Sequence, residues 1–183
     1  MLESFYNYCG SDLNEKNLSK FIDCFIREKG IDMKKEIRRI EKSWKEIENE
    51  FQKKMNLFFN MDLADKKINV YLTTNDRCLY SVSKNCFFIT ATTQSPKRII
   101  MHELLHFYTS YAFEKELANL DGKLAYDVKE SLTEILNLEF SHLLDGEEKG
   151  YPQHQRMHQL IREEWKKEKN IKKIFEKLIK ALL

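Results

Sequence analysis

The sequence predicts an α+β protein in which a small antiparallel β-sheet packs on a mostly helical body. Two observations support this fold class. Apolar residues recur at helical spacing on both sides of residues 66–92, whereas that stretch alternates apolar and polar residues between turn signals. The 183 residues are enough for one well-packed core. We therefore expect a single domain over 1–183, with N-terminal helices in 1–60, a core in 66–143 and C-terminal helices in 144–183.

Two helices are predicted before residue 60. Residues 14–29 form the first, which Gly30 ends. Residues 32–59 form one long helix whose apolar residues fall near heptad spacing over about three heptads. So short a repeat favours a helix docked on the core over a coiled coil. The apolar positions are Ile37, Ile40, Trp44, Ile47, Phe51 and Phe58.

Three short β-rich segments follow, at residues 68–72, 78–82 and 87–92. Turn residues separate them at 74–76 and 83–85, which predicts an antiparallel arrangement of consecutive strands. Periodicity then predicts helices over 96–113, 127–143, 153–168 and 171–182.

The most informative segment lies in the first of these helices. His102-Glu103-Leu104-Leu105-His106 matches the H-E-x-x-H pattern, in which two His one helical turn apart converge on a metal ion. Glu103 then faces the open side of the ion as a general base. A chance match in a chain with five His has odds of about one in a hundred. The setting supports a helix, since Ser95 suits the N-cap and Pro96 the first turn.

A catalytic zinc site needs a third protein ligand. The longer pattern H-E-x-x-H-x-x-G-x-x-H is excluded, because Thr109 and Ala112 stand where it requires Gly and His. Glu130 and Glu134 are four residues apart in a strongly apolar helical segment, where unpaired carboxylates would be costly. We assign Glu130 as the ligand and Glu134 as the acceptor of a ligating imidazole's ring N–H. The reverse assignment stays open.

Other acidic residues are weaker candidates for ligands. Asp121 precedes Gly122 in a predicted turn, and Asp127 suits the N-cap of the helix that carries Glu130. Acidic residues further along the chain are expected on a solvated surface. They are Asp145, Glu147 and Glu148.

Together, His102-Glu103-x-x-His106 and Glu130, which follows after 23 intervening residues, resemble the gluzincins, the thermolysin-like zinc peptidases. The resemblance covers roughly residues 68–140 and extends to small uncharacterised bacterial proteins with the same two motifs. It implies a zincin-like core, zinc as cofactor and a peptide or protein as substrate. It also implies an edge strand beside the metal, for which 88–91 is the candidate; ordinary sheet pairing is the alternative. Gluzincins commonly have Asp where this chain has Glu134.

The resemblance further implies a His or Tyr that stabilises the oxyanion of the reaction. Tyr151 and His154 follow a loop ending at Gly150 and open a predicted helix, so we assign them as catalytic candidates. Alternatively, His154 and His158 pack against the body on the face that carries Trp165. A second metal at these two His has no evident third ligand. His142 is expected at the surface.

Composition narrows the class of protein. Charged residues make up 33% of the chain and leave a net charge of only +2, which argues against a nucleic-acid partner. The Lys-rich stretch 166–180 also carries an apolar stripe, as an amphipathic helix does. We expect no membrane segment and no signal peptide, since 2–8 is short and contains Glu3.

The cysteines indicate a reducing, cytoplasmic location. They show no C-x-x-C spacing and no nucleophile context, although a disulfide across a hairpin between two of them stays open. They are Cys9, Cys24, Cys78 and Cys86, of which the hairpin pair is Cys78 and Cys86. The oligomeric state is not predicted.

The sequence therefore predicts a zinc-dependent metallopeptidase. Zinc is bound by His102, His106 and Glu130, and Glu103 assists attack of water on a peptide bond. Two alternatives remain at this point. One is a catalytically silent protein-interaction module that zinc stabilises, and the other is a zinc hydrolase of a non-peptide amide.

Overall fold

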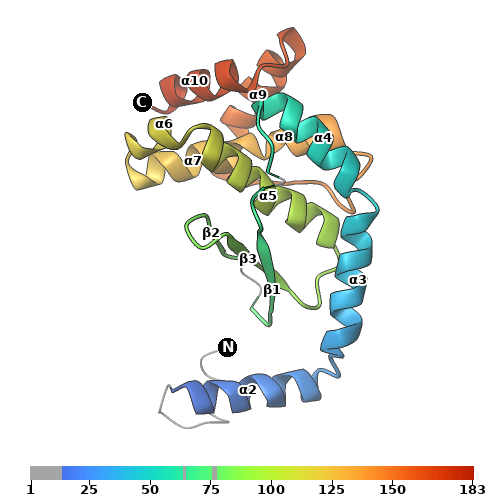
Figure 1. Ribbon diagram of the computed structural model, residues 1–183. Coiled ribbons are helices and arrows are strands. Elements are labelled where there is room, and N and C mark those ends of the chain that lie inside the picture. The colour runs from blue at the N-terminus through green and yellow to red at the C-terminus, as the bar shows by residue number, and fades with distance from the viewer. Residues whose placement is uncertain (1–13, 64, 76–77) are drawn as a thin grey trace.

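The computed structural model describes residues 14–63, 65–75 and 78–183. The chain is α+β: helices dominate, and one small sheet lies beneath the central helix α5 (Figure 1). The elements are α2 (Glu15–Glu28), α3 (Met33–Lys45), α4 (Glu48–Phe59), β1 (Asn69–Thr73), β2 (Tyr80–Ser81), β3 (Cys86–Thr90), α5 (Pro96–Ala112), α6 (Glu114–Ala118), α7 (Gly122–Leu132), α8 (Glu134–Phe140), η1 (Pro152–His154), α9 (Gln155–Lys167) and α10 (Ile171–Leu182).

The sheet is mixed, so the antiparallel prediction was wrong. Its strand order is β1-β3-β2, with β3 in the centre. Residues 82–85 join β2 to β3 in an antiparallel hairpin, and Asn85 has a left-handed φ of 47°. β1 instead runs parallel to β3, with Val70 opposite Phe87. Because β1 and β2 lie on opposite sides of β3, they are not a hairpin despite the turn residues between them.

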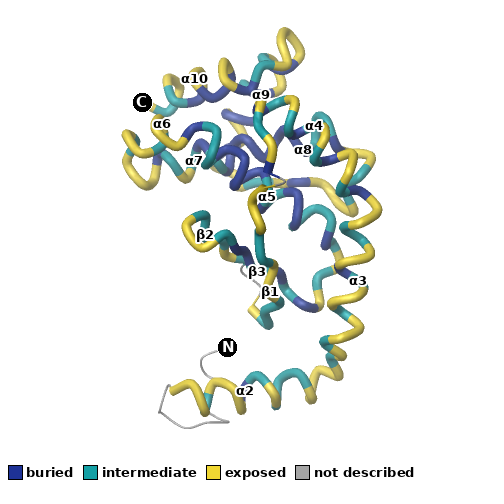
Figure 2. Tube along the Cα trace, viewed as in Figure 1, coloured by how far each residue is buried: buried dark blue, intermediate teal, exposed yellow. Residues whose placement is uncertain are grey.

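The predicted helix over 32–59 is two helices, α3 and α4, separated at Glu46 and Ile47. Ile47 leaves the helical region with φ of −121° and is 4% exposed. The break brings Trp44 and Phe51 into an edge-on contact, with ring centroids 5.7 Å apart. Ile47 and Phe51 are both buried at this break. α3 runs down one side of the molecule toward α2, which is mostly exposed or half-buried (Figure 2).

The predicted helix over 127–143 begins earlier and is also broken. Asp121 is the N-cap of α7 and accepts hydrogen bonds from the N–H groups of Lys123 and Leu124, so the N-cap assigned to Asp127 was wrong. Thr133 separates α7 from α8: its N–H and its hydroxyl both donate to the Glu130 carbonyl. This tight turn means that Glu130 and Glu134 do not belong to one continuous helix.

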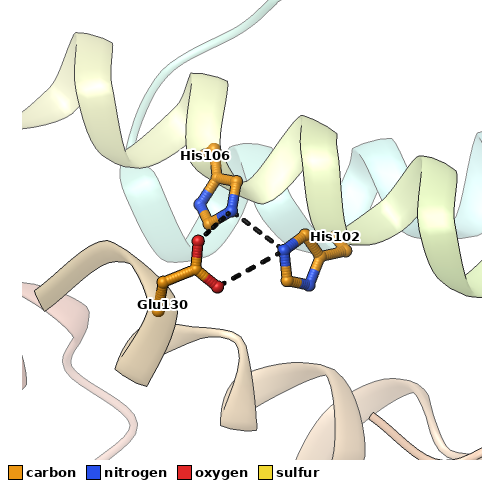
Figure 3. A group of neighbouring side chains, drawn as sticks. All are labelled: His102, His106 and Glu130. Atoms are coloured by element: carbon orange, nitrogen blue, oxygen red, sulfur yellow. Dashed lines mark hydrogen bonds and ion pairs between the residues drawn. The ribbon is translucent and has the colours of Figure 1, made fainter. Parts of the chain in front are cut away.

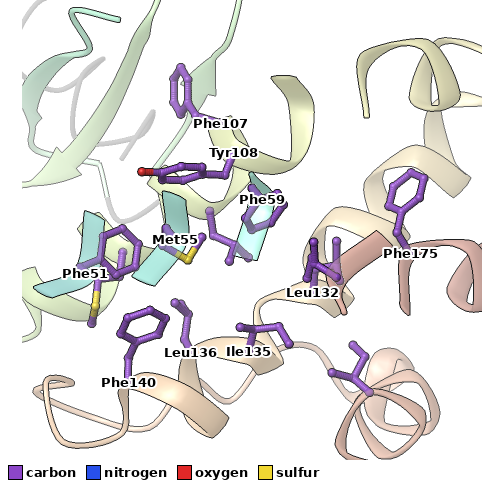
Figure 4. Packing of buried hydrophobic residues seen from close by; sticks show 14 of the residues in the cluster. Phe51, Met55, Phe59, Phe107, Tyr108, Leu132, Ile135, Leu136, Phe140 and Phe175 are labelled. Atoms are coloured by element: carbon purple, nitrogen blue, oxygen red, sulfur yellow. The ribbon is translucent and has the colours of Figure 1, made fainter. Parts of the chain in front are cut away.

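The core lies between α5 and the helices around it (Figure 4). From α4, Phe51 packs against Phe140 of α8 with ring centroids 5.0 Å apart. From α5, Tyr108 contacts Phe59 and donates a hydrogen bond to Asn56. α5 is therefore held from several sides, which fixes the side chains on its remaining face. In the described part of the chain no helix has both the length and the apolar character needed to cross a membrane.

Candidate metal centre

Two imidazoles on α5 face each other one helical turn apart. The Nε2 atoms of His102 and His106 lie 3.0 Å apart.

α5 begins at Pro96 as predicted, but the Ser95 side chain does not cap it. Asp145 does so instead, because its carboxylate accepts hydrogen bonds from the N–H groups of Lys97 and Arg98. Asp145 is exposed, as the sequence predicts, and in addition it caps α5.

Glu130 on α7 completes a cluster with these imidazoles (Figure 3). Its Oε2 lies 3.6 Å from His102 Nε2, and its Oε1 lies 3.4 Å from His106 Nε2. Ligands at zinc's usual bond lengths in a tetrahedral site lie about 3.3 Å from one another. The three separations bracket that value, so the donors fit a zinc ion. In the part of the chain that the structure describes, they form the one group of three possible ligands close enough to share an ion.

Burial and neighbouring carboxylates set the charge of the cluster. Burial opposes protonation of His102, but Glu148, whose Oε2 lies 3.2 Å from Nδ1, raises the pKa of this ring overall. When the ring is neutral, a proton on Nδ1 leaves Nε2 with a lone pair directed at the cluster. Burial lowers the pKa of His106 to about 4, so that ring is neutral. Burial also opposes ionisation of Glu130, yet hydrogen bonding and charge from His106 lower its pKa overall. Lone pairs from three side chains thus converge where a positive ion would satisfy them.

Glu103 lies beside the cluster on the wall of a solvent-open cleft of about 1070 Å³. Its side chain is 4% exposed, and its buried Oε2 has no hydrogen-bond partner among the described residues. Burial raises the pKa of Glu103 to about 7; the charges of Glu130 and Glu148 add to this, while His102 opposes it. A carboxylate in this state can accept a proton and return it.

Glu134 does not reach the imidazoles of the cluster. It is buried against α9, where Arg162 Nε donates to its Oε1 at 2.6 Å and His158 Nδ1 lies 3.6 Å from its Oε2. The sequence predicts that Glu134 accepts the ring N–H of an imidazole in the cluster, but Glu148 lies beside His102 Nδ1 instead. Glu148 is 5% exposed, so its predicted place on a solvated surface was wrong. The turn at Thr133 explains the difference, because it points Glu134 away from Glu130.

Tyr151 and His154 occupy different environments. Tyr151 lines the cleft and is 46% exposed. His154 is buried, and its Nε2 pairs with Asp127 Oδ1 at 2.9 Å. Together with His158, it packs against the body, as the alternative interpretation expected. His142 is exposed and contacts Glu50, which confirms its predicted place at the surface.

Sequence reasoning did not identify two tyrosines that line the cleft. Tyr126 lies one turn before Glu130 on α7, next to Tyr151 with ring centroids 6.3 Å apart. Tyr80 of β2 stacks on His106, with centroids 4.7 Å apart and an angle of 24° between the rings. Only the i,i+4 spacing of Tyr126 and Glu130 could have indicated that Tyr126 lies on the same side of α7 as the candidate ligand.

β2 is the sheet edge that borders this cleft. The prediction that 88–91 forms an edge strand was wrong, because β3 is paired on both sides. Leu79 and Tyr80 line the cleft instead.

Three cysteines are free thiols, so the disulfide left open between two of them is absent; they are Cys24, Cys78 and Cys86. Cys9 and residues 2–8 lie outside the described residues.

Comparison with known proteins gave no significant match to a family model, a curated protein or a solved structure. The resemblance to gluzincins therefore rests on the two motifs and stays a prediction.

Proposed function

We propose that this chain is a zinc-dependent metallopeptidase with a zincin-like pairing of the H-E-x-x-H helix α5 and the Glu-bearing helix α7. The observation that carries the proposal is the convergence of His102, His106 and Glu130 at separations of 3.0 to 3.6 Å, next to the Glu103 carboxylate. Zinc held by these three side chains supplies Lewis acidity, which lowers the pKa of a bound water and polarises a carbonyl.

Glu103 acts as the general base and then the general acid. It takes a proton from the water that attacks the peptide carbonyl carbon, and it delivers that proton to the amine as the C–N bond breaks. Its free, buried Oε2 supports this role, since no protein donor competes for that oxygen in the described part of the chain. Tyr126 and Tyr151 line the same cleft and can donate hydrogen bonds to the oxyanion.

The edge strand β2 offers a way to align an extended peptide. Its backbone is paired to β3 on one side only, and Leu79 and Tyr80 border the cleft. A substrate that adds to this edge lies beside the cleft, with alternate carbonyl groups paired to β2 and the others directed away from that strand.

The test compares the wild type with Glu103→Gln, which keeps the shape of the side chain but removes its basicity. We expect Glu103→Gln to retain one zinc per chain and to lose about 10²- to 10⁴-fold in the rate of peptide-library cleavage. Glu163→Gln, at an exposed position of α9 outside the cleft lining, is the control and should cleave normally. Glu130→Ala should lose zinc. Equal turnover by Glu103→Gln rules out the mechanism.

Two other outcomes favour the alternatives. A wild type that binds zinc and melts at a lower temperature without it, but cuts no peptide, supports a silent interaction module. Cleavage of small amides but not of peptides supports a hydrolase of non-peptide substrates.

A further inference from the structure

Residues 144–151, here called the strap, cross from the end of α8 to η1 along one wall of the cleft. The strap is fastened to the molecule at separate points. Asp145 caps the N-terminus of α5, which is the helix that carries both imidazoles. The Asn137 side chain holds the backbone of Glu148 from both sides, donating to its carbonyl at 2.7 Å and accepting from its N–H at 3.0 Å. These contacts place Glu148 in a defined position.

The Glu148 carboxylate is directed inward from the strap. Its Oε2 lies 3.2 Å from His102 Nδ1 and 3.4 Å from Arg98 Nη1, and its Oε1 accepts from the N–H of Gly150. With 5% exposure, this carboxylate is shielded from water, so its contact with the imidazole is screened less than a contact at the surface. Glu148 therefore acts directly on one of the proposed metal ligands.

No described residue pairs with the corresponding atom of the other imidazole. His106 Nδ1 is buried without a hydrogen-bond partner among the described residues, and the ring is instead fixed by its stack on Tyr80. The two imidazoles thus differ at Nδ1: a carboxylate lies beside this atom of His102, whereas no described residue pairs with this atom of His106. A ring whose Nδ1–H is bound by a carboxylate keeps its Nε2 as a lone pair and is a stronger donor to a metal ion.

We propose that Glu148 is a positioning residue that fixes the tautomer of His102 and strengthens it as a metal ligand, so that the strap is part of the metal centre. The proposal rests on the proposed function to the extent that His102 binds a metal. It assigns to a loop carboxylate the role that the sequence gives to Glu134.

The experiment measures zinc affinity by competition with a chelating dye for the wild type, Glu148→Gln and Glu147→Gln. Glu147 is adjacent and lines the same cleft without contacting an imidazole in the described structure, so its variant is the matched control. We expect the Kd for zinc to rise about 10- to 100-fold in Glu148→Gln, as is typical when such a partner is lost. It should change less than about threefold in Glu147→Gln.

A second readout separates positioning from general stability. With Co²⁺ in place of zinc, the visible absorption bands report the ligand field, and we expect them to shift in Glu148→Gln but not in Glu147→Gln. Asn137→Ala releases the strap while keeping the carboxylate, and it should weaken zinc binding by a smaller factor. If Glu148→Gln fails to fold, Asn137→Ala still tests the proposal.

The outcomes distinguish this inference from the proposed function. A wild type that binds no zinc overturns both. A wild type that binds zinc tightly, with Glu148→Gln equal to it in affinity and in Co²⁺ spectrum, overturns the role of Glu148 alone. If the glutamine variant does not fold, unchanged affinity in Asn137→Ala overturns it.

Discussion

Among the described glycines, Gly150 near the end of the strap is the one where an added methyl group meets the closest neighbouring atom. Its φ is +59°, a region that L-residues with a Cβ rarely adopt. A Cβ built there lies 2.3 Å from Cε1 and 3.1 Å from Nε2 of His158, which is buried between the strap and α8. Gly150→Ala therefore adds backbone strain and a steric clash at the same place.

The two costs can be estimated separately. The left-handed backbone costs about 1 to 2 kcal/mol in any residue with a Cβ. Relieving a clash of this depth requires the His158 ring to move within a packed site, which costs about 1 to 3 kcal/mol. We thus expect Gly150→Ala to lower the free energy of unfolding by about 2 to 5 kcal/mol, measured by urea denaturation.

Two comparisons isolate these causes. Gly122→Ala is the control, because its Cβ meets nothing within 4 Å and its φ is not positive, so it should stabilise by up to about 1 kcal/mol. Repeating Gly150→Ala in a His158→Ala background removes the clash and leaves only the backbone strain. If Gly150→Ala costs the same in both backgrounds, the reasoning about His158 is refuted. If it costs nothing at all, the backbone reasoning fails as well.

Two further predictions concern the body of the protein. Phe140→Ala should destabilise by about 3 to 5 kcal/mol because the ring is fully buried, whereas Leu57→Ala, at a 73% exposed position, should change stability by less than about 0.5 kcal/mol in the same urea titration. For Glu139, burial opposes ionisation, but hydrogen bonds from Lys169 and Trp165 lower its pKa overall. A lowered pKa stabilises above the unfolded value, near 4.5, and this contribution is lost as pH falls through the folded value. Glu139→Gln should therefore cost about 1 kcal/mol at pH 7 and progressively less as the pH falls below 4.5; a cost that does not change with pH contradicts this.

The parts of the fold that the sequence predicts correctly are those with local causes. α5 begins at Pro96 and ends at Ala112 because its periodicity and its N-terminal proline are contained in the segment itself. The same holds for α10, whose bounds of 171–182 agree with its apolar stripe. The meeting of His102 with His106 also follows from helical spacing alone.

The sheet topology has no such local cause. A segment such as β1 carries the same alternation of side chains whether its neighbour runs parallel or antiparallel. The pairing is decided by which side of β3 each strand occupies, and that depends on the packing of the sheet beneath α5. A turn signal indicates that the chain bends, but it does not determine where the next strand pairs.

The case of Glu134 shows why the carboxylate that contacts an imidazole is harder to predict than the residues of the candidate cluster. The i,i+4 relation with Glu130 is correct only if the helix continues, and Thr133 ends it through its own hydroxyl. Hydrogen bonds of this kind compete with the helix without disturbing its apolar pattern, so periodicity cannot detect them. Glu148 is brought to His102 by contacts that span about 50 residues. A carboxylate that contacts an imidazole can come from any segment that packs there, so the spacing of acidic residues along the chain indicates Glu130 beside the imidazole pair but does not indicate Glu148.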